Sequence, residues 1–211
     1  WELQLRLASE GNIIVYPLCI LLLLSIISSY VYNTSSIHIV TFVLTVLMIF
    51  CLNFFRDPKR KIPRQNNLIL SPADGKIIKI SELDDPNSGE KLKVVSIFLS
   101  VFNVHANRMP IDGQFIDVQY KKGNFLAAFD HKASEQNERT EIKIETEFGI
   151  IKVKQIAGLV ARRILCYAKV GDQMEAGERL GFIRFGSRTD IILPASINLK
   201  IELDQKVVGG E

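Results

Sequence analysis

The sequence predicts a compact, mainly β domain, built as a small barrel or sandwich, after an N-terminal hairpin of two transmembrane helices. Residues 11–55 contain no Asp, Glu, Lys or Arg, and nearly all charged residues of the chain follow Arg56. From Leu68 onward, short segments rich in β-branched residues alternate with clusters of turn-forming residues, which is typical of a mainly β domain. The chain therefore divides into a membrane part and a water-soluble part.

Two apolar runs, residues 13–32 and 37–55, approach the length of about 20 residues that a helix needs to cross a bilayer. Buried helices of soluble proteins normally carry a polar stripe, and neither run has one. A secretory signal peptide has one shorter apolar run behind a basic start. Residues 1–55 are therefore predicted to form a membrane region with two transmembrane helices, joined at the polar residues 33–36.

A basic linker, residues 56–66, follows the second run and contains five Lys or Arg side chains. Such a cluster beside a membrane span favours the cytoplasmic side and attracts anionic lipid head groups. A solvated charged linker is compatible with both effects. We expect both termini in the cytoplasm and the soluble domain on the cytoplasmic face of the cell (inner) membrane.

Charge and cysteine content argue against several kinds of site. The formal net charge of +3 does not indicate nucleic-acid binding. Cys19, Cys51 and Cys166 lack metal-ligand spacing, so neither a metal site nor a disulfide framework is predicted, which fits a reducing compartment. Because the chain starts at Trp1 and not at Met, we expect a few further N-terminal residues.

The soluble part, residues 67–211, shows strand and turn patterns in alternation. Strands are expected at 76–80, 93–99 and 142–146, a turn at 84–89, and a loop or short helix at 132–139. The glycines of residues 170–181 are spaced as tight turns between short strands, which resemble the turns of barrel-sandwich-hybrid domains.

Three segments bring a hydroxyl, an imidazole and a carboxylate to this one domain. They are residues 185–190 with Ser187, residues 103–110 with His105, and residues 71–75 with Asp74. Such a set can activate a nucleophile, with the base and the group that orients the base coming from other elements. These residues alone leave the question open, because Asp74 also fits a turn and His105 also fits an ordinary core or surface histidine.

Further motifs accompany these three in a fixed order. The full set is Phe-Arg-Asp-Pro at 55–58, Ser-Pro-Ala-Asp-Gly at 71–75, Phe-Asn-Val-His-Ala-Asn-Arg at 102–108, Lys-Ala-Ser-Glu-Gln-Asn-Glu-Arg at 132–139, Gln-Ile-Ala-Gly at 155–158, Ala-Arg-Arg at 161–163 and Phe-Gly-Ser at 185–187. Together they resemble the short bacterial and archaeal type of phosphatidylserine decarboxylase over nearly the whole soluble part. Longer members read Leu-Gly-Ser-Thr where this chain reads Phe-Gly-Ser-Arg.

The resemblance implies a precursor that cuts itself between Gly186 and Ser187, giving a β chain up to 186 and an α chain of residues 187–211. Ser187 would attack the Gly186 carbonyl and then become a covalent pyruvoyl cofactor. Glycine at 186 would permit close approach and strained dihedrals. His105, oriented by Asp74, would be the base.

The resemblance also implies the reaction. The amine of phosphatidylserine in the bilayer would form a Schiff base with the pyruvoyl group derived from Ser187. Carbon dioxide would leave and phosphatidylethanolamine would be released, with pyruvoyl as the electron sink that pyridoxal phosphate provides elsewhere. The sequence does not decide the acyl chains or the glycerol backbone, so archaetidylserine is also compatible.

One position departs from the longer enzymes, which have two histidines three positions apart in the middle motif. Here Arg108 takes the place of the second, so His105 would serve both self-cleavage and decarboxylation. Arg108, Arg162 and Arg163 are candidate substrate-binding residues. The last two would hold the lipid phosphate by bidentate hydrogen bonds, although an ordinary charged strand edge explains them equally well.

Two other functions fit parts of the sequence. A membrane-tethered barrel-sandwich binding or adaptor module would explain the glycine spacing, but no lysine occurs in the context of a biotin or lipoyl carrier. A serine hydrolase would use Ser187, His105 and Asp74, but the chain lacks a Gly-x-Ser-x-Gly elbow. Exposed strand edges in a small β domain often pair, so a homo-oligomer is compatible with each function.

Overall fold

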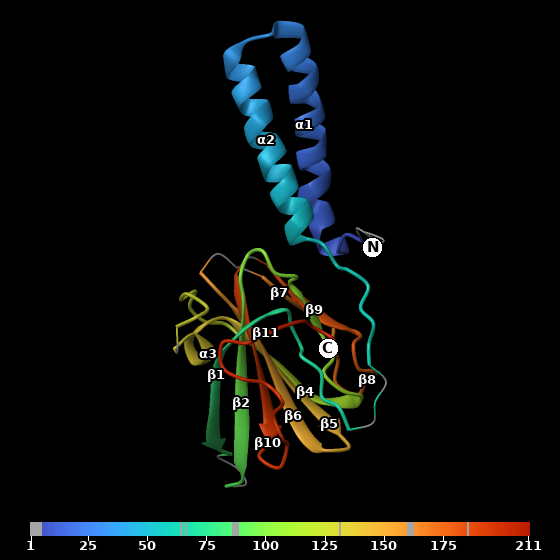
Figure 1. Ribbon diagram of the computed structural model, residues 1–211, viewed down its shortest axis with the longest axis vertical. Coiled ribbons are helices and arrows are strands. Elements are labelled where there is room, and N and C mark those ends of the chain that lie inside the picture. The colour runs from blue at the N-terminus through green and yellow to red at the C-terminus, as the bar shows by residue number, and fades with distance from the viewer. Residues whose placement is uncertain are drawn as a thin grey trace. The chain divides into compact units, whose positions relative to one another are not determined.

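The computed structural model describes residues 6–63, 65, 67–85, 89–130, 132–159, 163–184 and 186–211. The chain separates into two compact units, Trp1–Lys59 and Arg60–Glu211. The first unit is helical and the second is mainly β (Figure 1). The predicted fold class, a mainly β domain after two apolar helices, is confirmed. The finer boundaries at 55 and 66 stay predictions.

The N-terminal unit is a hairpin of two long helices, α1 (Asn12–Tyr32) and α2 (Ser35–Phe54), preceded by a short 3-10 turn, η1 (Ser9–Gly11). Asn33 closes α1 in a left-handed conformation, with φ 45°, and its N–H donates to the carbonyl oxygen of Ser29. A small side chain that tolerates positive φ suits such a helix end. The two predicted helical runs are therefore confirmed to within a few residues.

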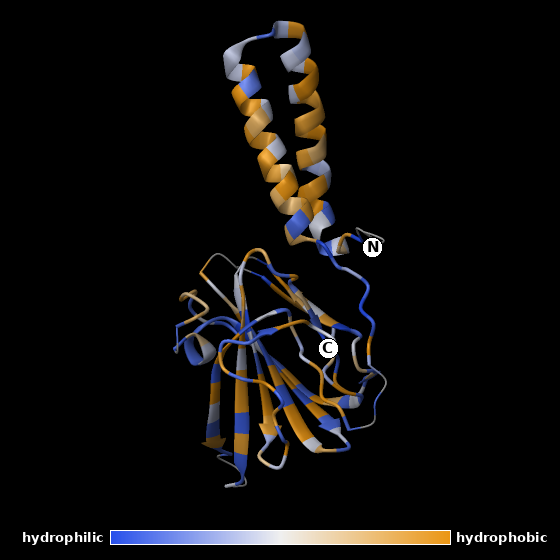
Figure 2. Cartoon of the chain, in the orientation of Figure 1, coloured by the Kyte–Doolittle hydropathy of each residue, from blue (hydrophilic) through white to orange (hydrophobic). Residues whose placement is uncertain are grey.

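The helices expose apolar side chains instead of burying them. Within α1 only Val15 is buried, while Tyr30 is 91% exposed and Ile13 is 70% exposed. Figure 2 shows hydrophobic residues along both helices. Helices of a soluble core would bury most of this surface. By length and composition, both helices are able to cross a membrane.

The second unit contains an eight-stranded antiparallel sheet that curls into a half-barrel (Figure 1). Its strands, in spatial order, are β11 (Lys206–Val207), β1 (Gly75–Asp84), β2 (Lys91–Leu99), β10 (Ser187–Pro194), β6 (Gly149–Ala157), β5 (Arg139–Thr146), β4 (Gly113–Lys121) and β8 (Gln173–Met174). The strands predicted at 76–80, 93–99 and 142–146 lie within β1, β2 and β5. The segments rich in β-branched residues are thus strands, as predicted.

A smaller, three-stranded sheet accompanies it, in the order β3 (Ala106–Arg108), β9 (Arg179–Ile183) and β7 (Ile164–Cys166). The expected turns around β8 and β9 are present, because Gly171 and Gly177 have φ of 93° and 83°. The segment expected to be a loop or a short helix contains the single helical turn α3 (Ala133–Gln136). Within the predicted turn at 84–89, residues 86–88 lie outside the described part of the chain.

The core of this unit lies on one face of the large sheet. Ile97 of β2, Ile144 of β5, Val153 of β6 and Ile191 of β10 belong to one buried apolar cluster. Strand β10 lies at the centre of the sheet, and every residue from 187 to 193 is buried. Since it pairs with β2 on one side and β6 on the other, β10 is held along most of its length.

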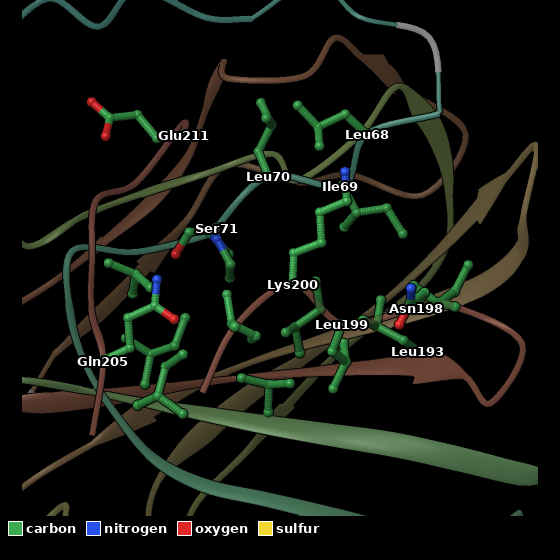
Figure 3. A pocket seen from close by; sticks show the side chains of 18 of the residues that line it. Leu68, Ile69, Leu70, Ser71, Leu193, Asn198, Leu199, Lys200, Gln205 and Glu211 are labelled. Atoms are coloured by element: carbon green, nitrogen blue, oxygen red, sulfur yellow. The ribbon is translucent and has the colours of Figure 1, made fainter. Parts of the chain in front are cut away.

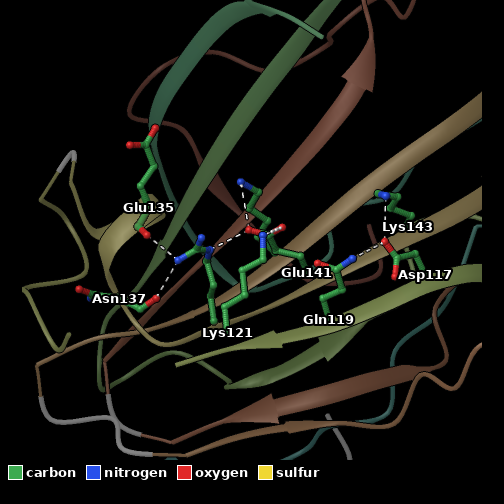
Figure 4. Close-up of polar contacts among 9 residues, drawn as sticks. Asp117, Gln119, Lys121, Glu135, Asn137, Glu141 and Lys143 are labelled. Carbon is green, nitrogen blue, oxygen red and sulfur yellow. Dashed lines mark hydrogen bonds and ion pairs between the residues drawn. The ribbon is translucent and has the colours of Figure 1, made fainter. Parts of the chain in front are cut away.

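Charged side chains cover the other face of the sheet. Glu141 of β5 accepts hydrogen bonds from Lys121 Nζ at 2.8 Å and from Arg139 Nε at 2.7 Å (Figure 4). Burial raises the pKa of Glu141, but the hydrogen bonds from Lys121 and Arg139 outweigh burial and bring this pKa down to about 2. Ionised Glu141 therefore stabilises the pairing of β4 with β5.

Replacing Glu141 with Gln should lower the stability of the chain at neutral pH, and the difference from wild type should vanish in acid. The pKa of this carboxyl is lowered from 4.5 to about 2. Its stabilisation is therefore complete above about pH 4.5 and is lost as the pH falls through about 2. Thermal unfolding of both proteins at a series of pH values, with exposed Glu82→Gln as control, checks this. A difference that is constant down to about pH 2 would contradict it.

Candidate active site

The turn before Ser187 carries the chain from one sheet to the other. Strand β9 ends at Ile183 in the small sheet, and β10 begins at Ser187 in the large sheet. Gly186 lies in the left-handed region, with φ 63°. Nothing lies within 4 Å of the position that a Cβ would occupy there. The backbone conformation, and not lack of space, therefore favours glycine at 186.

Ser187 is the first residue of β10 and is fully buried. It pairs with Leu99 of β2 and Ala157 of β6. Its Oγ atom is buried and has no hydrogen-bond partner among the residues that the structure describes. Buried hydroxyls are normally hydrogen-bonded, and an exception calls for an explanation such as a catalytic role. The backbone pairing of β10 therefore fixes the position of the Ser187 hydroxyl, and no described side chain hydrogen-bonds to it.

Gly158 packs directly against the carbonyl that precedes Ser187. A Cβ at position 158 would lie 2.2 Å from the Gly186 carbonyl oxygen and 3.1 Å from the Gly186 carbonyl carbon. Contacts this short do not occur, so a larger residue would displace the Gly186 carbonyl. The motif at 155–158 gave no signal for this role, because the contact joins two loops that are distant in sequence.

His105 lies at the same junction between the sheets as Ser187. The segment 100–105 leaves β2 after Leu99, the partner of Ser187, and enters β3, which pairs with β9. The His105 carbonyl accepts a hydrogen bond from the N–H of Ile183, at the end of β9. The structure therefore brings the backbone around His105 close to the turn that Ser187 follows.

The hydrogen bonding of His105 defines which ring nitrogen is basic. The ring is fully buried, and its Nδ1 lies 3.0 Å from the Asn103 carbonyl oxygen. Because a carbonyl only accepts hydrogen bonds, Nδ1 carries the proton in this arrangement. The lone pair of the neutral ring is therefore on Nε2, the atom able to take a proton.

Asp74 precedes β1 and is buried. Its carboxylate accepts hydrogen bonds from Arg60 Nη2, at 2.9 and 2.7 Å, and from the N–H of Gly209, at 2.9 Å. These contacts link the basic linker to the C-terminal residues. The predicted orientation of His105 by Asp74 stays a prediction.

The three candidate arginines differ in their surroundings. Arg108 is buried and donates from Nη1 to the Gly177 carbonyl oxygen at 3.0 Å. Arg163 is exposed, and its carbonyl oxygen accepts a hydrogen bond from the N–H of Arg184, next to the turn. Arg162 lies outside the described residues. Contact of these arginines with substrate stays a prediction.

The family model described as phosphatidylserine decarboxylase matches residues 47–211. A phosphatidylserine decarboxylase proenzyme of Chlorobaculum tepidum is 47% identical over 164 residues, 78% of this chain and 76% of that protein. Proteins of the same name from Wolbachia pipientis wMel and Citrifermentans bemidjiense are 51% identical over 167 residues and 46% over 171. These alignments cover 76% and 81% of this chain, and 73% and 77% of the relatives.

The chain belongs to the phosphatidylserine decarboxylase family. The resemblance inferred from the motifs is thereby confirmed, as is the prediction that the chain is an enzyme of this class. Membership favours a decarboxylase over the serine hydrolase and over the adaptor module. Decarboxylation is the activity that the names of its relatives describe.

A buried charge pair of the decarboxylase was not predicted from sequence. Arg188 donates from Nε to Asp190 Oδ1 at 2.6 Å and from Nη2 to Asp190 Oδ2 at 3.2 Å. Two serines complete the network. Ser96 Oγ accepts a hydrogen bond from Arg188, and Ser134 Oγ donates one to Asp190. Opposite charges two positions apart on one strand were the available signal, since such residues share one face. The network holds the α3 segment on the outer face of β10.

An apolar pocket of about 680 Å³ lies elsewhere in the decarboxylase domain (Figure 3). Its floor includes Ile77, Val95, Ile97 and Ile191, and segments around 67–72 and 196–201 line its sides. Ser187 and His105 are not among its lining residues. This pocket is therefore separate from the candidate active site.

Arg188→Met should lower the free energy of unfolding by about 3–5 kcal/mol, because it leaves the Asp190 carboxylate buried without its counter-charge. Adding Asp190→Leu should recover most of this loss, because an apolar pair needs no such partner. Urea unfolding of the detergent-solubilised chain, in a Ser187→Ala background that excludes cleavage, measures both. Lys169→Met, at an exposed position, is the control. Equal destabilisation of the single and double variants would contradict the assignment.

Proposed function

We propose that the enzyme cuts its own Gly186–Ser187 bond, converts Ser187 into a pyruvoyl group, and decarboxylates phosphatidylserine to phosphatidylethanolamine and CO2. The observation that carries this proposal is the geometry at the turn. A buried Ser187 hydroxyl, for which no described residue is a hydrogen-bond partner, follows a left-handed Gly186 whose carbonyl packs against Gly158. The word proenzyme in the names of the relatives supports a processed precursor.

The cut needs only groups of the chain and one water molecule. The Ser187 oxygen bonds to the Gly186 carbonyl carbon as the peptide C–N bond breaks, which leaves an ester and a free amine. Removal of the Ser187 α-proton expels the Gly186 carboxylate and leaves dehydroalanine. Water then replaces the nitrogen, which departs as ammonia, and residue 187 becomes a pyruvoyl group. His105 Nε2 is the proposed base, and Asp74 the proposed group that orients it.

The site fits a group formed at residue 187. The ketone oxygen of the pyruvoyl group comes from one water molecule, and its other carbonyl oxygen comes from Ser187. Among the described residues, the buried Ser187 hydroxyl has no hydrogen-bond partner that it would have to give up. A pyruvoyl group supplies a ketone that binds the substrate amine and withdraws electrons as CO2 leaves. The surrounding strands exclude bulk water, and His105 is proposed to return a proton to the substrate carbon. Arg108, Arg162 and Arg163 are proposed to contact the lipid phosphate.

The α chain is proposed to stay bound after the cut, because β10 pairs with both β2 and β6. The helices α1 and α2 are proposed to anchor the enzyme in the bilayer that holds its substrate. The basic residues of 56–66 support a cytoplasmic position of the catalytic domain. Residues 1–55, 56–66 and 67–211 would then be anchor, linker and catalytic domain.

The purified wild-type enzyme should consist of two chains, one ending at Gly186 and one beginning at residue 187. Intact-mass measurement checks this. The small chain should resist Edman sequencing, because a pyruvoyl group has no free amine. Ser187→Ala should give one uncut, inactive chain, because the attacking hydroxyl and the later ketone belong to the same residue. An active preparation of uncut chain with unmodified Ser187 would disprove the proposal.

Gly158→Ala should slow self-cleavage by about 10- to 100-fold, because the added methyl group displaces the Gly186 carbonyl from its place beside Ser187. The fraction of cut chain, followed on a denaturing gel after synthesis in a cell-free system, measures the rate. Leu159→Ala removes an exposed side chain from the next residue and should cut like wild type. Equal rates for all three proteins would refute a role for this contact.

A further inference from the structure

A row of buried polar side chains lies beside Ser187 in the interior of the domain. Gln155 of β6 donates from Nε2 to Asn107 Oδ1 at 2.8 Å, and Asn107 of β3 donates from Nδ2 to Thr189 Oγ1 at 3.1 Å. All three side chains are fully buried. Gly181 of β9 makes room for the row, since a Cβ there would lie 2.6 Å from Gln155 Nε2. The row therefore joins both sheets at a depth that water does not reach.

The strand register places Gln155 next to Ser187. Ser187 pairs with Ala157, and Thr189 pairs with Gln155. Residues two apart on a strand share a face, so Ser187 and Thr189 face the same side of the sheet. Gln155 is then the diagonal neighbour of Ser187 on that side, at a backbone separation of about 7–8 Å that a long side chain is able to span.

Two atoms in this small region lack a hydrogen-bond partner within the part of the chain that the structure describes. They are Gln155 Oε1, an acceptor, and Ser187 Oγ, a donor and acceptor. Leaving either group buried and unsatisfied is unfavourable, yet in the uncut chain they do not bond to each other. Gln155 is therefore not holding the hydroxyl that performs the cut. A neutral amide is also not a base, so its oxygen is suited only to accept a hydrogen bond.

We propose that Gln155 Oε1 accepts a hydrogen bond from the amino group of the serine head group at residue 187, and from the same amino group in the ethanolamine product. This inference rests on the proposed function, because residue 187 must be where the amine arrives. A primary amine has N–H groups to donate, whereas the trimethylammonium of choline has none. Gln155 is thus a residue that selects lipids with a primary amine over those with choline.

The experiment compares binding of glycerophosphoethanolamine and glycerophosphocholine to the full chain in detergent, by ligand-observed NMR. Intact mass is measured first for every variant. Wild type should prefer the ethanolamine compound, because its primary amine binds both the ketone at residue 187 and Gln155 Oε1. Gln155→Met, which keeps the shape but removes the acceptor, should lower this preference by about tenfold, the value of one hydrogen bond. Gln155→Glu, which keeps an acceptor, should retain or increase it, and exposed Gln119→Met should behave like wild type.

The experiment gives different results if the proposed function is wrong and if only the role of Gln155 is wrong. A wild-type chain that is uncut yet active overturns the proposed function, whatever Gln155 does. A cut, folded Gln155→Met that keeps the wild-type preference overturns the role of Gln155 alone. If Gln155→Met stays uncut, Gln155 acts in self-cleavage and the inference is wrong. If Gln155→Met does not fold, Gln155→Glu decides, because a carboxylate facing an ammonium must not weaken the preference.

Discussion

The pairing of β10 on both sides is the constraint on which the rest of the structure depends. Residues 187–192 hydrogen-bond to β2 and to β6 at once, so the strand has no freedom to shift its register. Ser187 is fixed as its first residue, and the turn before it must take up the unusual backbone conformation seen at Gly186. A break before Ser187 would leave residues 188–192 paired with both neighbouring strands. The proposed cleavage therefore needs no rearrangement of the strand that keeps the reactive residue.

The two faces of β10 bury polar groups in opposite ways. On the outer face, Arg188 and Asp190 satisfy each other with two hydrogen bonds, and a complete network of this kind favours a single register. On the inner face, Ser187 and Gln155 each keep one atom without a partner. Buried polar atoms without a hydrogen bond occur in folded proteins where the chemistry of a site requires them. On β10, the residues that stabilise the strand, Arg188 and Asp190, therefore face the opposite side from Ser187, the residue proposed to react.

The sequence predicted the fold well because its signals are local. Apolar runs without charge marked α1 and α2, and β-branched segments marked the strands. The site was predicted only through motifs, which identified Ser187 and His105 but not their neighbours. The contact of Gly158 with the Gly186 carbonyl is tertiary, and no local pattern encodes it. Gln155 belongs to the motif at 155–158, but that motif gave it no role until the strand register showed it beside Ser187.

Asp74 shows why a catalytic assignment and a structural one must be separated. The carboxylate that motif reasoning assigns to His105 also binds Arg60, the first residue of the second unit, and the N–H of Gly209 near the C-terminus. Removing it would loosen both ends of the domain as well as the proposed base. An uncut Asp74 variant alone therefore does not establish that Asp74 orients His105. An Arg60 variant removes one contact of the carboxylate and keeps the carboxylate itself, so the difference between the two variants measures what Asp74 contributes beyond its contact with Arg60.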